Sequence, residues 1–253
     1  MENAKNTSPF KLGHSLNIGD PQVIGIVIAI FTVLITIGFF LWRYKKTARK
    51  AVLLMGLSDA GKTLIYTQLL HHKFVRTHTS VKENSGEYAF GKGLLRIIDI
   101  PGHERLRAKF FDEYKHAAKG IVYIVDSVTV QKDIRDVAEF LYTLLSDLVV
   151  ANHSLPFLIL CNKQDQTMAK GCSVIKSLLE KEMNVLRTTK SSQLESTNET
   201  ANNNTFLGKK EKEFEFAHLL PVKVDFVEST AVQRDPEEPA ELDGLKKWLL
   251  QIA

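Results

Sequence analysis

Apolar residues gather in one long run and several shorter ones along the chain. The long run covers residues 23–42 and contains 20 residues without a charge. At about 1.5 Å of rise per residue, a helix of this length crosses the roughly 30 Å hydrocarbon core of a bilayer. A cleaved signal peptide would have a shorter apolar stretch with a basic region directly before it, and a buried core helix would show a polar face. The run therefore predicts a transmembrane helix.

After residue 50, short apolar runs that indicate buried strands alternate with segments of helical spacing. Strands are expected at residues 51–55, 94–98, 120–125, 156–161 and 222–227. Helices are expected at residues 64–70, 134–148, 174–179 and 242–249. This alternation is typical of an α/β fold, with a mostly parallel sheet covered by helices on both faces. Residues 86–90 are the candidate for an antiparallel edge strand, because a Gly-Lys-Gly turn separates them from the next strand.

One segment, residues 188–212, breaks this alternation because it is rich in Ser, Thr, Asn, Lys and Glu. It has too few apolar side chains to offset the conformational entropy that is lost on ordering. We therefore expect a disordered insertion between a helix and the last strand.

The first candidate for chemistry is a phosphate-binding loop between a predicted strand and a predicted helix, the context that this motif requires. Backbone N–H groups in such a loop can point at phosphate oxygens, and the helix N-terminus adds a partial positive charge. Lys62 is expected to contact the β- and γ-phosphates, and the Thr63 hydroxyl is expected to bind Mg²⁺. The loop consists of Gly56, Leu57, Ser58, Asp59, Ala60, Gly61, Lys62 and Thr63.

A candidate reader of the nucleotide base follows the strand predicted at residues 156–161. Asn162, Lys163 and Asp165 form the pattern N-K-x-D there. The Asp165 carboxylate can accept hydrogen bonds from guanine N1–H and the guanine 2-amino group, whereas adenine has neither donor. A site of this kind discriminates against an analogue that lacks these donors by a factor of roughly 10⁴. The pattern predicts guanine specificity, so GTP and GDP are the expected ligands.

A third motif, with the pattern D-x-x-G, places Asp99 and Gly102 at the end of another predicted strand. Asp99 is expected to hold Mg²⁺ through water, and the Gly102 N–H is expected to sense a γ-phosphate. Thr79 lies between the first helix and the next strand, where a switch threonine would close over Mg²⁺. Ser80 is the alternative for that role. The three motifs in this order predict a P-loop GTPase fold.

Positive charge is concentrated directly after the long apolar run. Residues 43–50 carry five Lys or Arg residues, whereas residues 1–22 carry only Lys5 and Lys11. The Lys- and Arg-rich side of a membrane span stays in the cytosol. We therefore expect a lumenal N-terminus at residues 1–22 and a cytosolic GTPase domain at residues 51–253. Residues 43–50 form a basic juxtamembrane segment, with attraction of anionic lipid as a second interpretation. The net charge of +4 owes much to this segment and does not indicate nucleic-acid binding.

The chain contains two cysteines, Cys161 and Cys172. Both fall inside the predicted cytosolic domain, and disulfide bonds are rare in that compartment. We expect two free thiols.

The phosphate-binding loop is similar to that of the Arf and Sar branch of the small GTPases. Combined with the N-terminal span, the motif at residues 99–105 and residues 208–216 after the polar insertion, it resembles the β-subunit family of the signal recognition particle receptor. This resemblance implies an endoplasmic-reticulum membrane protein that binds GTP and then holds the receptor α subunit. The translocon and the ribosome are further candidate partners. The resemblance also implies that the Ala231 backbone touches the guanine oxygen, although Val232 stands where the family has Lys.

Two classes of function stay open, and His103 is the residue that bears on them. Many small GTPases have Gln at this position to orient the attacking water. Translational GTPases have His there and hydrolyse GTP, usually with help from a partner. His103 is therefore the candidate catalytic residue, with slow unaided hydrolysis expected. The chain is either a GTP-loaded docking subunit or an Arf-like membrane-tethered switch that cycles by hydrolysis with a different effector.

Overall fold

The structure of the 253-residue chain is a computed structural model. It describes residues 21–46, 49–91, 93–196, 207–209, 212–233 and 240–253, and at residues 21–25, 39–46 and 191–196 it describes the backbone alone. The chain divides into two compact units, Met1–Ala48 and Arg49–Ala253. The described part of the first unit is a helix, and the second unit is an α/β domain.

The helix of the first unit is α1, Pro21–Lys46, which contains the whole apolar run at residues 23–42. The structure thus confirms a helix over the segment that was predicted to span a membrane. The Thr32 and Thr36 hydroxyls donate hydrogen bonds to carbonyls three residues earlier, at 2.8 Å each. In α1 the side chains are described only at residues 26–38, and among the residues that the structure describes no helix is long and apolar enough to cross a membrane. Of residues 1–22, which were predicted to be lumenal, residues 1–20 lie outside the described residues.

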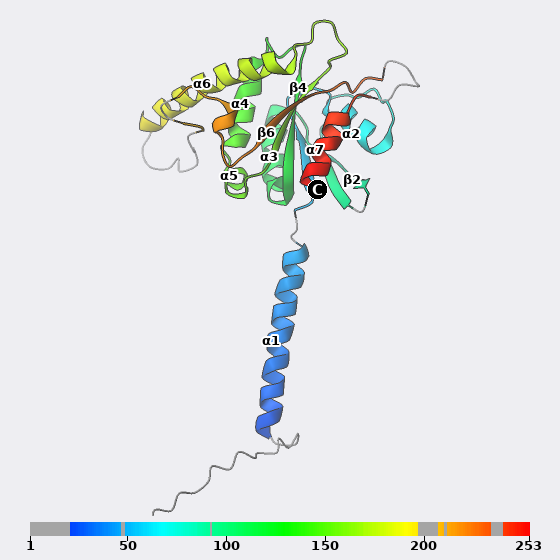
Figure 1. Cartoon of the computed structure of the whole chain (residues 1–253), viewed down its shortest axis with the longest axis vertical. Coiled ribbons are helices and arrows are strands. Elements are labelled where there is room, and N and C mark those ends of the chain that lie inside the picture. Colours follow the sequence, from blue (N-terminus) through cyan, green and yellow to red (C-terminus); the bar gives the residue numbers. More distant parts are fainter. Residues whose placement is uncertain (1–20, 47–48, 92, 197–206, 210–211, 234–239) are drawn as a thin grey trace, which may run out of the picture. The chain divides into compact units, whose positions relative to one another are not determined.

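The second unit is built around a six-stranded sheet (Figure 1). Its strands are β1 (Ala51–Met55), β2 (Asn84–Phe90), β3 (Gly93–Asp99), β4 (Ala118–Asp126), β5 (Phe157–Asn162) and β6 (Val224–Glu228). Their order across the sheet is β2-β3-β1-β4-β5-β6. Strand β2 pairs antiparallel with β3, and all other pairs are parallel. The predicted sheet, mostly parallel with an antiparallel edge strand, is confirmed.

Helices cover both faces of this sheet (Figure 1). They are α2 (Lys62–His71), α3 (Glu104–Tyr114), α4 (Ile134–Leu145), α5 (Leu148–His153), α6 (Cys172–Ser196) and α7 (Asp243–Ile252). Successive side chains of a strand point to opposite faces. In β1, Leu53 and Met55 pack on the side of α3 to α6, whereas Val52 and Leu54 pack on the side of α2 and α7. Because both faces are covered, the central strands are apolar at nearly every position.

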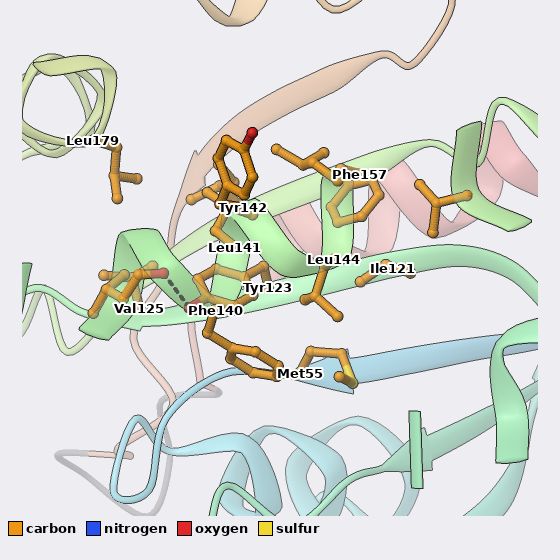
Figure 2. Close-up of a cluster of buried hydrophobic side chains, with 14 of the residues drawn as sticks. Met55, Ile121, Tyr123, Val125, Phe140, Leu141, Tyr142, Leu144, Phe157 and Leu179 are labelled. Atoms are coloured by element: carbon orange, nitrogen blue, oxygen red, sulfur yellow. Dashed lines mark hydrogen bonds between the residues drawn. The ribbon is translucent and has the colours of Figure 1, made fainter. Parts of the chain in front are cut away.

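The larger core lies between the sheet and α4 (Figure 2). Its buried members include Met55 from β1, Tyr123 from β4, and Leu141 and Leu144 from α4. The Tyr123 hydroxyl donates a hydrogen bond to the carbonyl of Val137 at 2.8 Å, so this buried polar group is satisfied. Burying each large apolar side chain stabilises the fold by about 1.5–3 kcal/mol. This core holds β1 and β4, whose carboxyl ends carry part of the site described below.

The helix predicted at residues 134–148 is interrupted in the structure. α4 ends at Leu145, and a separate helix, α5, begins at Leu148. The cause is Asp147, whose Oδ1 accepts hydrogen bonds from the N–H groups of Val149 at 2.8 Å and Val150 at 3.4 Å. An N-cap of this kind stabilises a new helix start by about 1 kcal/mol. The apolar spacing alone did not reveal the break between the two helices.

α6 includes residues 188–196, so the predicted disordered insertion is wrong for these residues. The Thr188 and Thr189 hydroxyls donate hydrogen bonds to carbonyls four residues earlier, at 3.0 Å each. Lys190 Nζ lies 3.7 Å from Glu139 Oε1 of α4. The polar composition is compatible with a helix here because its polar groups find partners within α6 and on α4.

The chain that returns from α6 is also anchored where it is described. Leu207 is buried in the core, and Arg187 of α6 donates a hydrogen bond to the Lys209 carbonyl at 2.9 Å. Arg187 also donates to the carbonyl of Lys212. Residues 197–206 and 210–211 of the predicted insertion lie outside the described residues.

Candidate nucleotide-binding site

The phosphate-binding loop connects the carboxyl end of β1 to α2, at the edge of the sheet where parallel α/β proteins bind ligands. Gly56 has a φ of 140°, and a Cβ atom there would lie 2.3 Å from the Ile124 carbonyl oxygen. Gly61 has a φ of 94°, and a Cβ atom there would lie 2.4 Å from Nδ2 of Asn162. A left-handed backbone and such close neighbours admit only glycine. The loop conformation therefore depends on both glycines of the motif.

Lys62 opens α2, and its side chain turns back over the loop. Its Nζ donates a hydrogen bond to the Leu57 carbonyl at 2.6 Å, and the residue is only 6% exposed. Burial lowers the pKa of Lys62 to about 8, while the nearby carboxylates of Asp99 and Asp59 oppose this shift. A phosphate oxygen beside the amine would favour its charged form. A buried amine thus lies against the loop that was predicted to bind phosphate.

Thr63 and Asp99 form a polar corner beside the loop. The Thr63 hydroxyl donates a hydrogen bond to Asp99 Oδ2 at 2.8 Å, and Asn84 Nδ2 donates to the same oxygen at 3.0 Å. Asp99 is completely buried, and burial raises the pKa of its carboxyl against the opposing effect of these hydrogen bonds. Its Oδ1 has no hydrogen-bond partner in the described part of the chain. A buried carboxylate oxygen in this position suits a cation.

The corner fits a Mg²⁺ ion that is shared with phosphate groups. Mg²⁺ prefers oxygen ligands and is usually held by one or two carboxylates together with substrate phosphates. The Ser80 hydroxyl adds a further oxygen, since its Oγ lies 3.1 Å from Oγ1 of Thr63. Among the described residues, no cluster of three or more His, Cys, Asp and Glu side chains is present that could hold a metal by itself. Of the two candidate switch residues, Thr79 and Ser80, it is Ser80 whose hydroxyl contacts Thr63.

A small, open pocket lies against the phosphate-binding loop. Its walls are formed by the loop, by residues 77–80 and by Gly102. A Cβ atom at Gly102 would lie 2.5 Å from the backbone nitrogen of Ser58 and 2.6 Å from Nζ of Lys62. This contact requires glycine at residue 102. The pocket thus brings together the loop, Thr79 and Gly102.

His103 lies outside the pocket lining and begins α3 instead. Its ring Nδ1 accepts a hydrogen bond from the backbone N–H of Arg105 at 3.4 Å, so it acts as the N-cap of the helix. The side chain is exposed. In this conformation, the candidate catalytic residue stabilises the helix start, and reaching the pocket would require it to leave the cap.

Asn162 connects the predicted base reader to the phosphate-binding loop. Its Nδ2 donates a hydrogen bond to the Ala60 carbonyl at 2.9 Å, although the two residues are 102 positions apart in the sequence. Its Oδ1 accepts hydrogen bonds from the N–H of Ala231 at 3.3 Å and from the Ser229 hydroxyl at 3.4 Å. Asn162 is buried, so its amide braces three segments of the site.

The rest of the base-reading motif is held by the end of β4. Lys163 Nζ lies 2.6 Å from Asp126 Oδ2, and Gln164 Nε2 donates a hydrogen bond to the Ser127 hydroxyl at 2.9 Å. Asp165, expected to contact guanine, is partly exposed in the same turn. Sequence reasoning missed Asp126 and Ser127. Their signal was present, because a polar pair follows the apolar run at residues 120–125 just as Asp99 and Asn162 follow theirs.

Comparison with known proteins decides the family. The family model described as the signal recognition particle receptor beta subunit matches residues 47–224 of the chain. The chain belongs to this beta-subunit family. It is accordingly a GTP-binding small GTPase, and the resemblance drawn from the motifs is confirmed.

Individual relatives agree with this assignment. The signal recognition particle receptor subunit beta of Rattus norvegicus is 41% identical over 240 residues, which cover 92% of this chain and 88% of the relative. A solved structure of the mammalian SRP receptor contains a chain with 41% identity and a TM-score of 0.69, covering 80% of this chain and 100% of that one. An SRb-GTP/SRX complex from Chaetomium thermophilum matches with a TM-score of 0.62 at 22% identity, covering 81% and 98%, and shows the shared fold alone.

Proposed function

We propose that this beta-family protein is the membrane-anchored, GTP-binding subunit that holds the receptor α subunit at the endoplasmic reticulum membrane for co-translational targeting. The proposal that the protein binds a nucleotide rests on the side-chain amide of Asn162. This amide forms hydrogen bonds with the Ala60 carbonyl of the phosphate-binding loop and with the N–H of Ala231. A phosphate cradle and a base reader are thereby held at a constant spacing, as one nucleotide ligand requires. The proposed role in the receptor rests on membership of the beta-subunit family.

In this proposal, the residues 56–63 and Gly102 bind the phosphates of GTP or GDP. Lys62 supplies a positive charge, and the glycines allow the backbone N–H groups to approach closely. Asp165 accepts the two guanine donors, while Asn162 and Lys163 hold its turn in place and the Ala231 backbone contacts the guanine oxygen. The site thus selects guanine by pairing and phosphate by charge.

The metal ligands in this proposal are Thr63, Asp99 acting through water, and Thr79, with Ser80 as the alternative to Thr79. These residues would hold the ion, and a bound Mg²⁺ would supply positive charge that stabilises the phosphate groups. Thr63 and Asp99 already share a hydrogen bond at 2.8 Å, so the two oxygens are positioned before the ion arrives. Binding then needs little rearrangement of this corner.

We favour a docking subunit with slow GTP hydrolysis over a switch that cycles rapidly. The supporting observation is that His103 caps α3 and is not part of the pocket lining. To orient an attacking water, the His103 side chain would have to break its hydrogen bond with the N–H of Arg105. The alternative, an Arf-like membrane-tethered switch with a different effector, predicts rapid hydrolysis once that effector binds.

The loop between α2 and β2 is the candidate docking surface for the α subunit. Phe74, Val75 and Val81 in this loop are exposed by 48%, 46% and 72%. Neighbouring residues of the same loop, Thr79 and Ser80, line the pocket. A γ-phosphate that contacts the pocket side of the loop would therefore also arrange its apolar outer side. A ligand shifts such an equilibrium only through its differential affinity for the two states.

Nucleotide-dependent capture of the α subunit by the full chain in detergent tests this proposal. Capture should be about 5- to 150-fold stronger with a non-hydrolysable GTP analogue than with GDP, the range typical of coupled sites. Phe74→Ser should weaken capture in the GTP state and leave nucleotide affinity unchanged. Val185→Ser is the control, because it changes an exposed apolar residue of α6. Equal capture with both nucleotides would contradict gating and leave a constitutive anchor.

We also propose that residues 23–42 cross the membrane and that the GTPase domain faces the cytosol. The uncharged run and the five basic residues at 43–50 support this orientation. Protease added outside sealed vesicles of endoplasmic reticulum should digest the domain after residue 50 and spare a short fragment that contains α1. Protection of the large domain would reverse the orientation, and extraction of the intact chain by alkaline carbonate would refute the span.

A further inference from the structure

The two cysteines of the chain lie against each other beside the base-reading motif. The Sγ atoms of Cys161 and Cys172 are 3.0 Å apart, and both residues are free thiols. Cys161 lies in β5 directly before Asn162, and Cys172 is the first residue of α6. The segment between them, residues 162–171, therefore contains the whole N-K-x-D motif.

We propose that Cys161 and Cys172 form a reversible disulfide that closes the segment 162–171 and speeds the release of guanine nucleotide. The effect on nucleotide rests on the function proposed above, whereas the disulfide itself does not. A disulfide has an S–S distance of about 2.05 Å, so the two sulfur atoms need to approach by only about 1 Å. No other cysteine in the sequence competes for either thiol.

Cys172 is the residue that would move when the disulfide forms. Cys161 is completely buried, and its strand is paired with Val125 of β4 on one side and Glu228 of β6 on the other. Cys172 is partly exposed at the end of a helix, where its N–H donates a hydrogen bond to Glu228 Oε1 at 2.7 Å. A partly exposed residue at the first position of a helix moves more easily than a buried residue in a strand that is paired on both sides. The disulfide would thus draw the start of α6 towards β5.

This movement has a direct route to the base reader. Gln164 Nε2 donates hydrogen bonds to the Lys170 carbonyl and to the Ser127 hydroxyl, at 2.9 Å each. Lys170 is two residues before Cys172, so a shift of Cys172 pulls on Gln164 in the middle of the motif. Lys163 already has a left-handed φ of 68°, a region that non-glycine residues rarely occupy, and has little freedom to absorb the shift. Asp165 is therefore displaced from its guanine-pairing position.

A small-molecule disulfide such as glutathione disulfide is the oxidant. The Cys172 thiolate attacks one of its sulfur atoms, and one glutathione leaves as a thiolate. The Cys161 thiol then attacks the Cys172 sulfur of the mixed disulfide, and its proton passes to the sulfur of the second glutathione as that glutathione leaves. The cysteine pair loses two electrons and two protons, and the oxidant is reduced to two glutathione molecules. Cys172 suits the first step because it is partly exposed and its hydrogen bond with Cys161 lowers its pKa.

Oxidation of the full chain in detergent tests both parts of the inference. After treatment with glutathione disulfide and digestion without a reducing agent, mass spectrometry should find two peptides joined through Cys161 and Cys172. Release of a fluorescent GDP should be about fivefold faster than from the reduced chain, at the low end of typical coupling between sites. Dithiothreitol should restore the slower rate.

Two variants control the experiment. Cys172→Ser, at the partly exposed position, should release GDP at the reduced wild-type rate and show no response to the oxidant. Cys161→Ala should be equally unresponsive if the pair acts together. Absence of the joined peptides, or an unchanged release rate in the joined form, would overturn the inference. Joined peptides from a chain that binds no guanine nucleotide even when reduced would instead refute the function proposed above.

Discussion

Asp165→Asn is expected to turn a guanine-specific protein into one that prefers xanthosine nucleotides. The Asp165 carboxylate accepts hydrogen bonds from guanine, whereas an Asn amide donates one, and this suits the 2-oxo group of xanthine. The ratio of GTP affinity to XTP affinity should fall by about 10⁴, the discrimination typical of sites that pair every polar group of their ligand. Displacement of a fluorescent GDP from the wild-type chain, and of a fluorescent xanthosine analogue from the variant, measures this ratio.

Asp225→Asn is the matched control for this substitution. It removes the same charge in β6, where Asp225 forms an ion pair with Lys223 at 3.0 Å and does not line the pocket. The control should keep the wild-type nucleotide preference. Unchanged GTP affinity in the Asp165→Asn variant would contradict the assignment of Asp165 as the base reader.

Thr63→Asn is expected to lower GTP affinity by about 10- to 100-fold, the loss typical when support for a metal ion is removed. The Thr63 hydroxyl contacts both Asp99, at 2.8 Å, and Ser80, at 3.1 Å. An Asn amide is larger and removes the hydroxyl oxygen that would bind Mg²⁺. GDP affinity should fall less, because GDP has less phosphate charge for a bound Mg²⁺ to neutralise. Titration of a fluorescent GTP analogue with and without EDTA measures the effect.

Thr63→Ser is the matched control, since it keeps the hydroxyl and removes only a methyl group. It should bind GTP with nearly wild-type affinity and remain sensitive to EDTA. The Thr63→Asn variant should lose that sensitivity. Equal GTP retention by the wild type and Thr63→Asn would show that the hydroxyl does not serve the metal.

Local patterns in the sequence determined the architecture of the GTPase domain. β1, for example, was predicted with its observed bounds, Ala51–Met55, because a strand covered on both faces is apolar at every position. The edge strand β2 was predicted from the turn that follows it. The phosphate-binding loop was also a local inference, since its glycines are required by the backbone of the loop itself.

Helix boundaries were less accessible from local patterns. Apolar residues keep helical spacing throughout residues 134–148, but α4 ends at Leu145 and capping by Asp147 starts a new helix. The composition at residues 188–196 indicated disorder, but hydrogen bonds within α6 and the contact of Lys190 with Glu139 accompany a helix there. Propensity is a weak guide where a tertiary contact supplies the missing stabilisation.

By itself, then, the sequence determined which motifs exist, their order along the chain and the strand ends that carry them. Only the tertiary structure decided how they meet. It joined Asn162 to Ala60, brought Ser80 against Thr63, turned His103 into a helix cap and set Cys161 against Cys172. The physical reason is that motifs depend on backbone conformations of a few neighbouring residues. Contacts between side chains distant in sequence depend instead on how the whole sheet and its helices pack.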